Sequence, residues 1–285
     1  QALYAAGDAV AQVRTGRSLT DALQRLEAGA SLGAAVQDLA YGTLRNLGLL
    51  DALLAELLRK PVKPPLHALL LTALYQLRAR PRTSHTTVDQ AVRAVSRLEP
   101  AAKGLANAVL RNYLRDAEAL VARCDSDTAH YSYPQWWIDR VRADWPRHWE
   151  SVLNAGNLHP PMTLRINQRR LTAERYLAGL GESGIKGEVI GAQAILLERP
   201  LPIESVPGFG AGEVSIQDAG AQLAAPLLDV RPGMRVLDAC AAPGGKAGHI
   251  LELADCALTA LDRDPVRVGR ISDNLGRLGF SARVV

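Results

Sequence analysis

Cysteine is scarce in this chain, and its spacing excludes two kinds of site. Three cysteines, Cys124, Cys240 and Cys256, occur among 285 residues, and no two of them form a C-x-x-C pair. The sequence therefore predicts neither a disulfide framework nor a cysteine-ligated zinc site. This usage fits a reducing compartment, so we expect a cytoplasmic protein that holds no metal.

The chain also lacks long apolar runs and the common nucleotide-binding patterns. No run of about 18 apolar residues occurs, so no transmembrane helix is expected. The dinucleotide pattern G-x-G-x-x-G is absent. The phosphate-loop pattern G-x-x-x-x-G-K-[ST] fails as well, because Ala247 follows Gly245 and Lys246 and supplies no hydroxyl for magnesium.

Length and charge suggest several domains with different partners. A chain of 285 residues, 48% hydrophobic, allows two or three domains with their own cores. The net charge of +4 is uneven: residues 1–125 hold 16 basic against 11 acidic residues, while residues 126–285 hold 17 against 18. The N-terminal excess suits a nucleic-acid backbone, although a solvated surface is the favoured interpretation for most of these charges.

Apolar periodicity divides the chain into three regions. Residues 1–124 carry apolar residues at three- and four-residue spacing, which predicts an all-α bundle, with Ser31 as one helix N-cap. Residues 125–212 predict a polar linker, a helix that begins near Pro134, and a small β-α-β-β unit. Residues 213–285 predict the start of a parallel α/β domain.

The expected elements of the last two regions are short. Strands are predicted at residues 162–167, 187–190, 194–198, 236–237, 257–262 and 282–285. Helices are predicted at residues 134–145, 172–181, 218–228, 246–253 and 273–278.

Two groups of polar or aromatic residues have two interpretations each. Four tryptophans fall within residues 136–149, among arginines, and such aromatics can stack on bases. We favour instead a packed core between domains. Arg165 and Asn167 could contact RNA, but a structural role in the strand is favoured.

The most informative stretch is Val236-Leu237-Asp238-Ala239-Cys240-Ala241-Ala242-Pro243-Gly244-Gly245-Lys246. It predicts a strand end, a turn of small residues and a helix N-terminus, which together form a nucleotide-cofactor site. We expect Gly244 and Gly245 to tolerate no side chain, because a Cβ would obstruct the ligand or strain the backbone. Asp262 ends a second strand about 20 residues later, where an acid that binds ribose hydroxyls is expected. Since the pyrophosphate patterns are absent, S-adenosylmethionine is the favoured cofactor.

Several segments carry a resemblance to a known family. Residues 236–246 resemble motif I of the RNA cytosine-5 methyltransferases, and residues 207–209 and 214–222 are similar to the segment that precedes it. Residues 70–77, 88–92 and 107–111 are similar to the late helices of NusB-type RNA-binding domains. The resemblance therefore indicates the RsmB/Sun/Fmu branch of this family.

The resemblance implies a fold and an activity. It implies a NusB-like helical RNA-binding domain at residues 1–124, an α+β linker subdomain that docks RNA at residues 125–212, and the first part of a Rossmann-like class I methyltransferase domain at residues 213–285. The implied reaction is S-adenosylmethionine-dependent methylation of carbon five of a cytosine in 16S ribosomal RNA of the small subunit. The implied cofactor-binding residues are Cys240, Ala241, Ala242, Pro243, Gly244, Gly245, Lys246 and Asp262.

The catalytic cysteines of the family have no counterpart in these residues. The family places them in a Pro-Cys and a Thr-Cys segment downstream of motif I, and neither segment occurs here. Cys240 lies in the cofactor loop and Cys256 has no basic neighbour, so we assign neither as the nucleophile. We expect the nucleophile beyond Val285, a truncated methyltransferase domain, and no methyl transfer by residues 1–285 alone.

Two other functions stay open at this point. One is a non-catalytic NusB-like RNA-binding or transcription-factor module with a vestigial cofactor domain. The other is a nicotinamide-dependent oxidoreductase, which the missing glycine pattern disfavours. In the favoured interpretation, the protein is a monomer that binds ribosomal RNA and S-adenosylmethionine and binds neither a membrane nor a metal.

Overall fold

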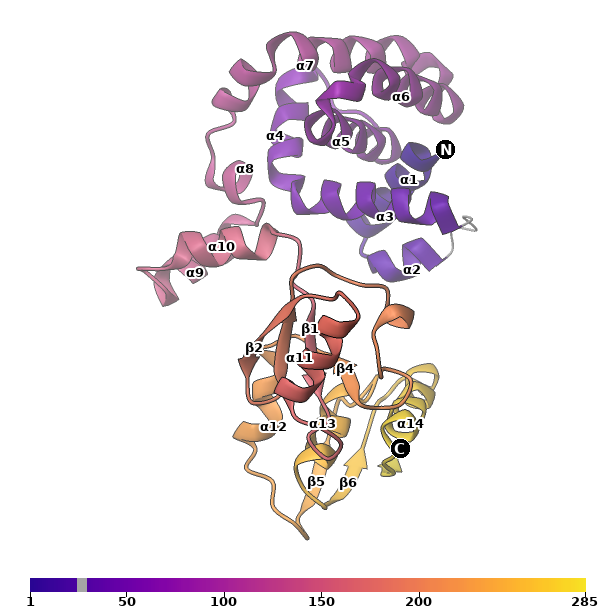
Figure 1. Cartoon of the computed structure of the whole chain (residues 1–285). Coiled ribbons are helices and arrows are strands. Elements are labelled where there is room, and N and C mark those ends of the chain that lie inside the picture. The colour runs from indigo at the N-terminus through magenta and orange to yellow at the C-terminus, as the bar shows by residue number, and fades with distance from the viewer. Residues whose placement is uncertain (25–29) are drawn as a thin grey trace. The chain divides into compact units, whose positions relative to one another are not determined.

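The computed structural model describes residues 1–24 and 30–285. Contacts between residues divide the chain into two compact units, Gln1–Leu158 and His159–Val285. Each unit is described by itself (Figure 1). Ser31 lies within the third helix, which is described from Ala30, but its side chain is outside the described part of the structure, so the capping role expected for it stays a prediction.

The described part of the first unit is helical, as the periodicity predicts. Its α-helices are α1 (Ala2–Arg14), α2 (Leu19–Gln24), α3 (Ala30–Arg45), α4 (Leu47–Leu57), α5 (Pro64–Ala79), α6 (Ser84–Leu98), α7 (Lys103–Arg123), α8 (Asp127–Tyr131), α9 (Gln135–Asp144) and α10 (Trp149–Asn157). Short 3-10 turns at Pro81–Thr83 and Pro100–Ala102 precede α6 and α7. Proline begins α5 because the first helical position needs no N–H donor.

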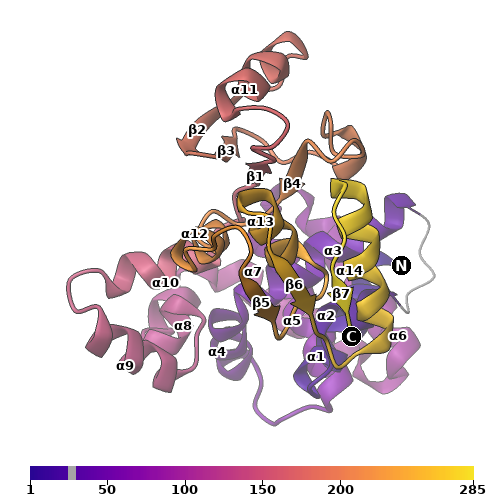
Figure 2. The ribbon, with the colours of Figure 1, turned by 90° about the horizontal axis from the view of Figure 1, so that it is seen from below.

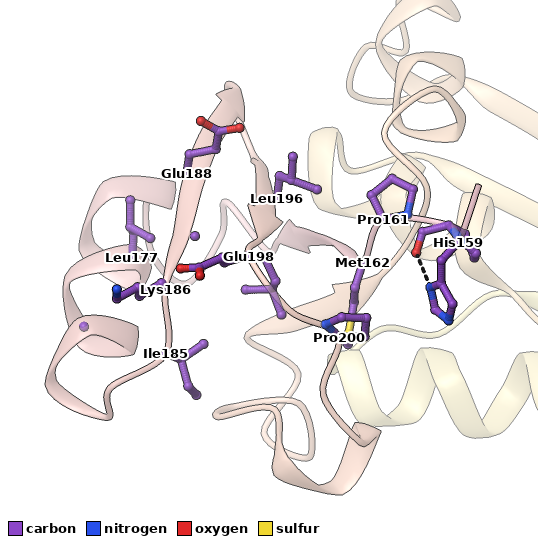
Figure 3. A pocket seen from close by; sticks show the side chains of 14 residues that line it. His159, Pro161, Met162, Leu177, Ile185, Lys186, Glu188, Leu196, Glu198 and Pro200 are labelled. Atoms are coloured by element: carbon purple, nitrogen blue, oxygen red, sulfur yellow. Dashed lines mark hydrogen bonds between the residues drawn. The ribbon is translucent and has the colours of Figure 1, made fainter. Parts of the chain in front are cut away.

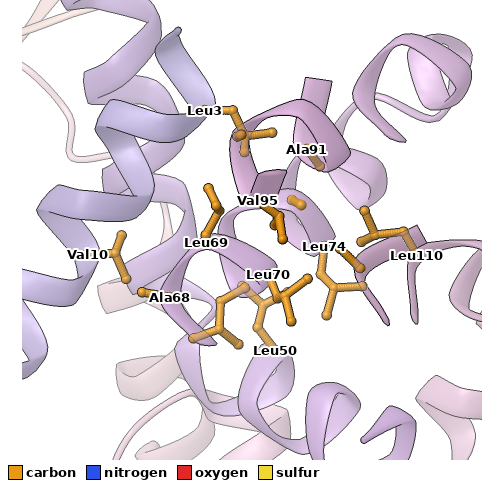
Figure 4. Close-up of a cluster of buried hydrophobic side chains, with 14 of the residues drawn as sticks. Leu3, Val10, Leu50, Ala68, Leu69, Leu70, Leu74, Ala91, Val95 and Leu110 are labelled. Atoms are coloured by element: carbon orange, nitrogen blue, oxygen red, sulfur yellow. The ribbon is translucent and has the colours of Figure 1, made fainter. Parts of the chain in front are cut away.

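Helix α5 forms the centre of the first unit's core. It contacts α1, α3, α4, α6 and α7. Leu69, Leu70 and Leu74 on α5 pack with Val95 and Leu110 from α6 and α7 (Figure 4). Full burial of each leucine contributes roughly 1.5–3 kcal/mol, so α5 anchors the bundle.

Helices α8, α9 and α10 form a small satellite cluster of the first unit. Helix α8 contacts α4. Ile138 and Val141 are buried on α9, as the amphipathic pattern predicts. The expected burial of the tryptophans is wrong for three of them, because Trp136, Trp137 and Trp145 are 67%, 40% and 59% exposed.

The second unit begins with an antiparallel sheet covered by one helix. Its strands are β1 (Thr163–Ile166), β2 (Gly187–Gly191), β3 (Ala194–Leu197) and β4 (Val214–Ile216), in the order β2-β3-β1-β4, and α11 (Ala173–Glu182) follows β1. Leu164 and Ile166 face α11 and join the core around Tyr176 and Leu180. Alternation along a strand turns Thr163 and Arg165 toward the opposite face.

A parallel sheet with its crossover helices completes the second unit. It comprises β5 (Arg235–Asp238), α13 (Gly245–Leu253), β6 (Ala257–Ala260), α14 (Pro265–Leu278) and β7 (Arg283–Val284), with strand order β5-β6-β7. Figure 2 shows β5 and β6 side by side with α14 next to them. Helices α13 and α14 contact each other and share a core with Leu258 and Ala260. On the opposite face, Leu237 is 62% and Leu261 is 41% exposed.

Two helices of the second unit differ from the prediction. Helix α14 begins at Pro265 instead of residue 273, because the side chain of Asp264 caps it by accepting a hydrogen bond from the Val266 N–H. Asp218 also caps a turn, by accepting from the Ala221 N–H at 3.1 Å. Its segment forms a 3-10 turn (Ala221–Leu223) and a four-residue α12 (Ala224–Leu227), not one helix through Leu228.

The predicted domain boundaries at 124/125 and 212/213 stay predictions. Helix α8, beyond the first boundary, contacts α4 of the bundle. Strand β4, beyond the second, pairs with β1 through Arg165 and Ser215. The β-α-β-β unit is thus extended by a fourth strand from the adjoining region.

Candidate functional site

The motif loop lies at the carboxyl end of β5, between Asp238 and the start of α13. The Ala241 N–H donates to the carbonyl of Leu261, the residue that follows β6, at 3.0 Å. The Gly244 N–H donates to the Ala241 carbonyl at 2.6 Å and closes the turn. These bonds fix the loop against the ends of two neighbouring parallel strands, where α/β proteins bind ligands.

The two glycines of the loop have different requirements. Gly244 has a φ of 95°, a left-handed conformation that favours glycine, and its added Cβ would lie 3.3 Å from the Cα of Ile271. The expected backbone requirement is therefore confirmed for Gly244. Gly245 has no such backbone requirement, because its φ lies outside the left-handed region and its Cβ would meet only the Gln217 amide at 4.0 Å; the expected obstruction of the ligand at Gly245 stays a prediction.

Asp262 lies beside this loop. Its Oδ2 accepts a hydrogen bond from the Ala242 N–H and its Oδ1 accepts one from the Asp264 N–H, both at 3.2 Å. Its carboxylate is 3.7 Å from the guanidinium of Arg267, which donates to the Ala242 carbonyl at 2.9 Å. The hydrogen bond from the Asp264 N–H, followed by that from Ala242, holds the pKa of Asp262 below its usual range. An anionic carboxylate has about four acceptor positions, so Asp262 retains capacity for a ligand.

The other predicted residues gather at the same place. Ala241 and Ala242 are buried, whereas Cys240, Pro243 and Lys246 are exposed. A cavity of about 400 Å³ adjoins the loop, and its lining includes Pro243, Gly245, Arg270, Asp273, Asn274 and Arg277. A larger cavity of about 960 Å³ lies apart from the loop, between Leu177 of α11, Glu188 of β2, Leu196 of β3 and the segment around Pro161 and Met162 (Figure 3).

One residue of the site was missed from the sequence. Asp238 ends β5 directly before the loop. Its Oδ2 is buried and has no hydrogen-bond partner among the described residues. A buried carboxylate oxygen without a donor is costly, so this atom suits a donor or cation supplied by a ligand. Its position at the carboxyl end of the strand before the motif loop was the sequence signal that could have identified it as a candidate site residue.

The face of α13 that packs against the antiparallel sheet is polar and buried. Arg165 forms an ion pair with Glu252, and Asn167 donates to the Gly212 carbonyl at 3.0 Å. The structural role favoured for Arg165 and Asn167 is therefore confirmed. His249 on the same face contacts the side-chain amide of Gln193, and burial, with the charge of Arg165, lowers the pKa of His249 to about 3.

The surroundings of Cys124 and Cys256 disfavour a nucleophilic thiolate. Burial raises the pKa of the Cys256 thiol, and it also raises that of Cys124. A raised pKa disfavours the thiolate, which is the nucleophilic form. In the described part of the chain, no cluster of three or more His, Cys, Asp or Glu residues is placed to hold a metal ion. None of the described helices has the length and apolar character needed to span a bilayer.

Three family models match successive parts of the chain. Residues 1–115 match the NusB family, residues 133–204 match the RsmF/B-like ferredoxin-like domain, and residues 225–285 match the 16S rRNA methyltransferase RsmB/F model. These matches follow the order of the helical bundle, the antiparallel sheet and the parallel sheet.

Curated relatives extend this match over nearly the whole chain. Ribosomal RNA small subunit methyltransferase B of Escherichia coli K12 is 39% identical over 289 residues, which cover 98% of this chain and 67% of that protein. The chain belongs to the RsmB/F methyltransferase family. The protein of the same name from Pseudomonas syringae pv. tomato DC3000 is 42% identical over 258 residues, 87% of this chain and 58% of that protein. This RsmB/F chain thus spans about three fifths to two thirds of the length of the relatives it matches.

Solved structures support the fold of this RsmB/F chain. The crystal structure titled PH0851 has a TM-score of 0.69 at 21% identity, and the match covers 99% of this chain and 68% of that one. A methyltransferase homologue from Pyrococcus horikoshii has a TM-score of 0.50 at 26% identity, over 55% of this chain and 53% of that one. A helical NusB-like region followed by an α/β region is therefore the architecture of this family member.

Proposed function

We propose that this chain binds S-adenosylmethionine at residues 240–246, Asp238 and Asp262, and that its protein methylates carbon five of a cytosine in 16S ribosomal RNA. The observation that carries the cofactor proposal is the closed loop at the end of β5, hydrogen-bonded to Asp262 beyond β6. The names of the relatives support ribosomal RNA of the small subunit as the substrate.

The residues present fit this cofactor. The start of α13 offers backbone N–H groups and the positive end of a helix dipole to a carboxylate. Asp262 offers charge-assisted acceptors to ribose hydroxyls. The unpartnered Oδ2 of Asp238 offers an acceptor to an ammonium group. When bound, S-adenosylmethionine supplies an electrophilic methyl group.

Methylation at carbon five needs a nucleophile in addition to this site. A thiolate must add to carbon six of the base, which makes carbon five electron-rich. Cys240 lies in the loop and the Cys256 thiol has a raised pKa, so we assign the role of nucleophile to neither of them. We assign it instead to a cysteine outside residues 1–285. The target cytosine must leave its stack to reach the methyl group.

The first unit is proposed to dock the RNA. It matches the NusB family, and residues 1–125 hold the basic excess of the chain. Phosphate contacts by such residues supply affinity without sequence information. A monomeric state and a cytoplasmic location stay predictions.

Calorimetric titration with S-adenosylmethionine tests the cofactor proposal. We expect saturable binding to the chain and at least tenfold weaker binding in Asp262→Asn, which removes the negative charge while preserving the shape of the side chain. Binding of 16S ribosomal RNA without binding of S-adenosylmethionine would instead favour the RNA-binding module with a vestigial cofactor domain. Incorporation of tritiated methyl groups at cytosine C5 by the longer protein tests the reaction itself.

A further inference from the structure

The buried ion pair between β1 and α13 joins the antiparallel sheet to the helix of the cofactor loop. Arg165 Nε donates to Glu252 Oε2 at 2.9 Å and Arg165 Nη2 donates to Glu252 Oε1 at 2.7 Å. The two side chains are 0% and 1% exposed. A buried pair of this kind is often no more stabilising than apolar residues of similar volume, so stability alone does not account for it.

The remaining donors of Arg165 extend the contact to the other end of α13. Its Nη1 donates to the Gly245 carbonyl at 2.8 Å and to Gln217 Oε1 at 2.6 Å. Gly245 begins α13 directly after Gly244, and Glu252 lies two helical turns later on the same face. One guanidinium therefore holds both ends of the helix, including the carbonyl next to the left-handed Gly244.

The packing of α13 leaves this arrangement little freedom. A Cβ added at Gly248, between the two contact points, would lie 3.6 Å from Arg165 Nη2 and 2.5 Å from Leu278 Cδ1. A side chain at Gly248 would therefore meet Leu278 first and would also touch the guanidinium of Arg165. With five donors committed, Arg165 also has none left for RNA.

We propose that Arg165 is a positioning residue that sets the loop at residues 240–246 for cofactor binding, through the Gly245 carbonyl. The proposal rests on the assignment of S-adenosylmethionine to this loop. Lysine at this position can still neutralise Glu252, but its ammonium lacks the planar fork that reaches Glu252, Gln217 and Gly245 together. Arg165→Lys should therefore preserve the fold and loosen the loop.

Arg169 provides a matched control on the same part of the unit. Its Nε donates to the Glu252 carbonyl at 3.1 Å and its Nη1 donates to Asp255 at 2.6 Å. These contacts hold the last turn of α13 and the residues after it, and they do not reach Gly245. Arg169→Lys makes the same chemical change without disturbing the start of the helix.

The test combines two measurements on the whole chain. In hydrogen–deuterium exchange without ligand, Arg165→Lys should speed exchange at residues 241–248 and leave β3 unchanged, whereas Arg169→Lys should leave both at the wild-type rate. In calorimetry, Arg165→Lys should bind S-adenosylmethionine at least tenfold more weakly, and Arg169→Lys should bind within about twofold of wild type.

A double variant separates positioning from stability. Arg165→Met with Glu252→Met removes both buried charges, so it should fold, as circular dichroism and the melting temperature report. We expect it to show the same fast loop exchange and weak binding as Arg165→Lys. Wild-type affinity and loop exchange in either variant would overturn the positioning role. If the wild-type chain binds no S-adenosylmethionine while the exchange effect is present, the cofactor assignment fails and the positioning role stands.

Discussion

Replacing Gly244 by alanine tests the loop geometry most directly. A left-handed residue other than glycine costs about 1–2 kcal/mol, and Gly244 has a φ of 95°. The added methyl group would also lie 3.3 Å from the Ile271 Cα, so the loop or α14 must shift by a few tenths of an ångström. If the left-handed loop is the form that binds S-adenosylmethionine, 1–2 kcal/mol weakens binding roughly fivefold to thirtyfold.

Two other glycines serve as controls in the same calorimetric assay. Gly16 has a φ of 98° with nothing within 4 Å of its Cβ, so Gly16→Ala imposes a similar backbone cost in the first unit and should leave cofactor affinity unchanged. Gly245→Ala has no such cost and should leave the melting temperature unchanged. Unchanged affinity and melting temperature in Gly244→Ala would refute the reasoning. Lost affinity with an unchanged melting temperature in Gly245→Ala would mean that the ligand contacts this residue.

Three further predictions concern charge. Asp262→Asn should weaken S-adenosylmethionine binding at least tenfold. Because the pKa of Asp262 is lowered, its carboxylate stays charged between pH 8 and 5, and its titration should not weaken binding to the wild-type chain in that range. A marked loss of affinity at pH 5 in calorimetry would contradict this. His249 has a pKa of about 3 in the folded chain and 6.5 in the unfolded chain, so the free energy of unfolding should fall by about 1.4 kcal/mol per pH unit as the pH drops below 6.5. Denaturation of His249→Gln should lack this contribution. Equal slopes of unfolding free energy against pH for the wild type and the variant would contradict the assignment. Binding of a 16S ribosomal RNA segment to the chain should weaken steeply with salt because released counterions drive phosphate contacts, and a salt-independent Kd in filter binding would indicate a different surface.

Local patterns predicted that the motif loop and Asp262 lie together, because both follow adjacent parallel strands, whereas their role in cofactor binding stays a prediction. The small residues 239–245 follow one parallel strand and Asp262 follows the next, so sequence spacing and spatial proximity coincide. The start of α14 was predicted too late, although Asp264 and Pro265 are typical residues for a helix N-terminus. The apolar pattern did not indicate this start, because Val266 in the first turn is exposed.

Local sequence patterns could not predict which distant segments of the chain contact each other. Arg165 and Glu252 are 87 residues apart, and nothing in either segment's periodicity indicates the other. The pairing of β4 with β1 similarly depends on contacts across about 50 residues. The tryptophans of α9 and its following turn were misjudged because burial was inferred from residue type, whereas Ile138 and Val141 occupy the buried stripe.

The uncovered face of the parallel sheet has a calorimetric consequence. Leu237, Leu261 and Val285 already expose 62%, 41% and 49% of their surface in the folded chain. The heat-capacity change of unfolding grows with the apolar area newly exposed to water. Residues 159–285 should therefore unfold with a smaller heat-capacity increment than the usual 12–15 cal/mol/K per residue, and their stability curve should be correspondingly flat with temperature.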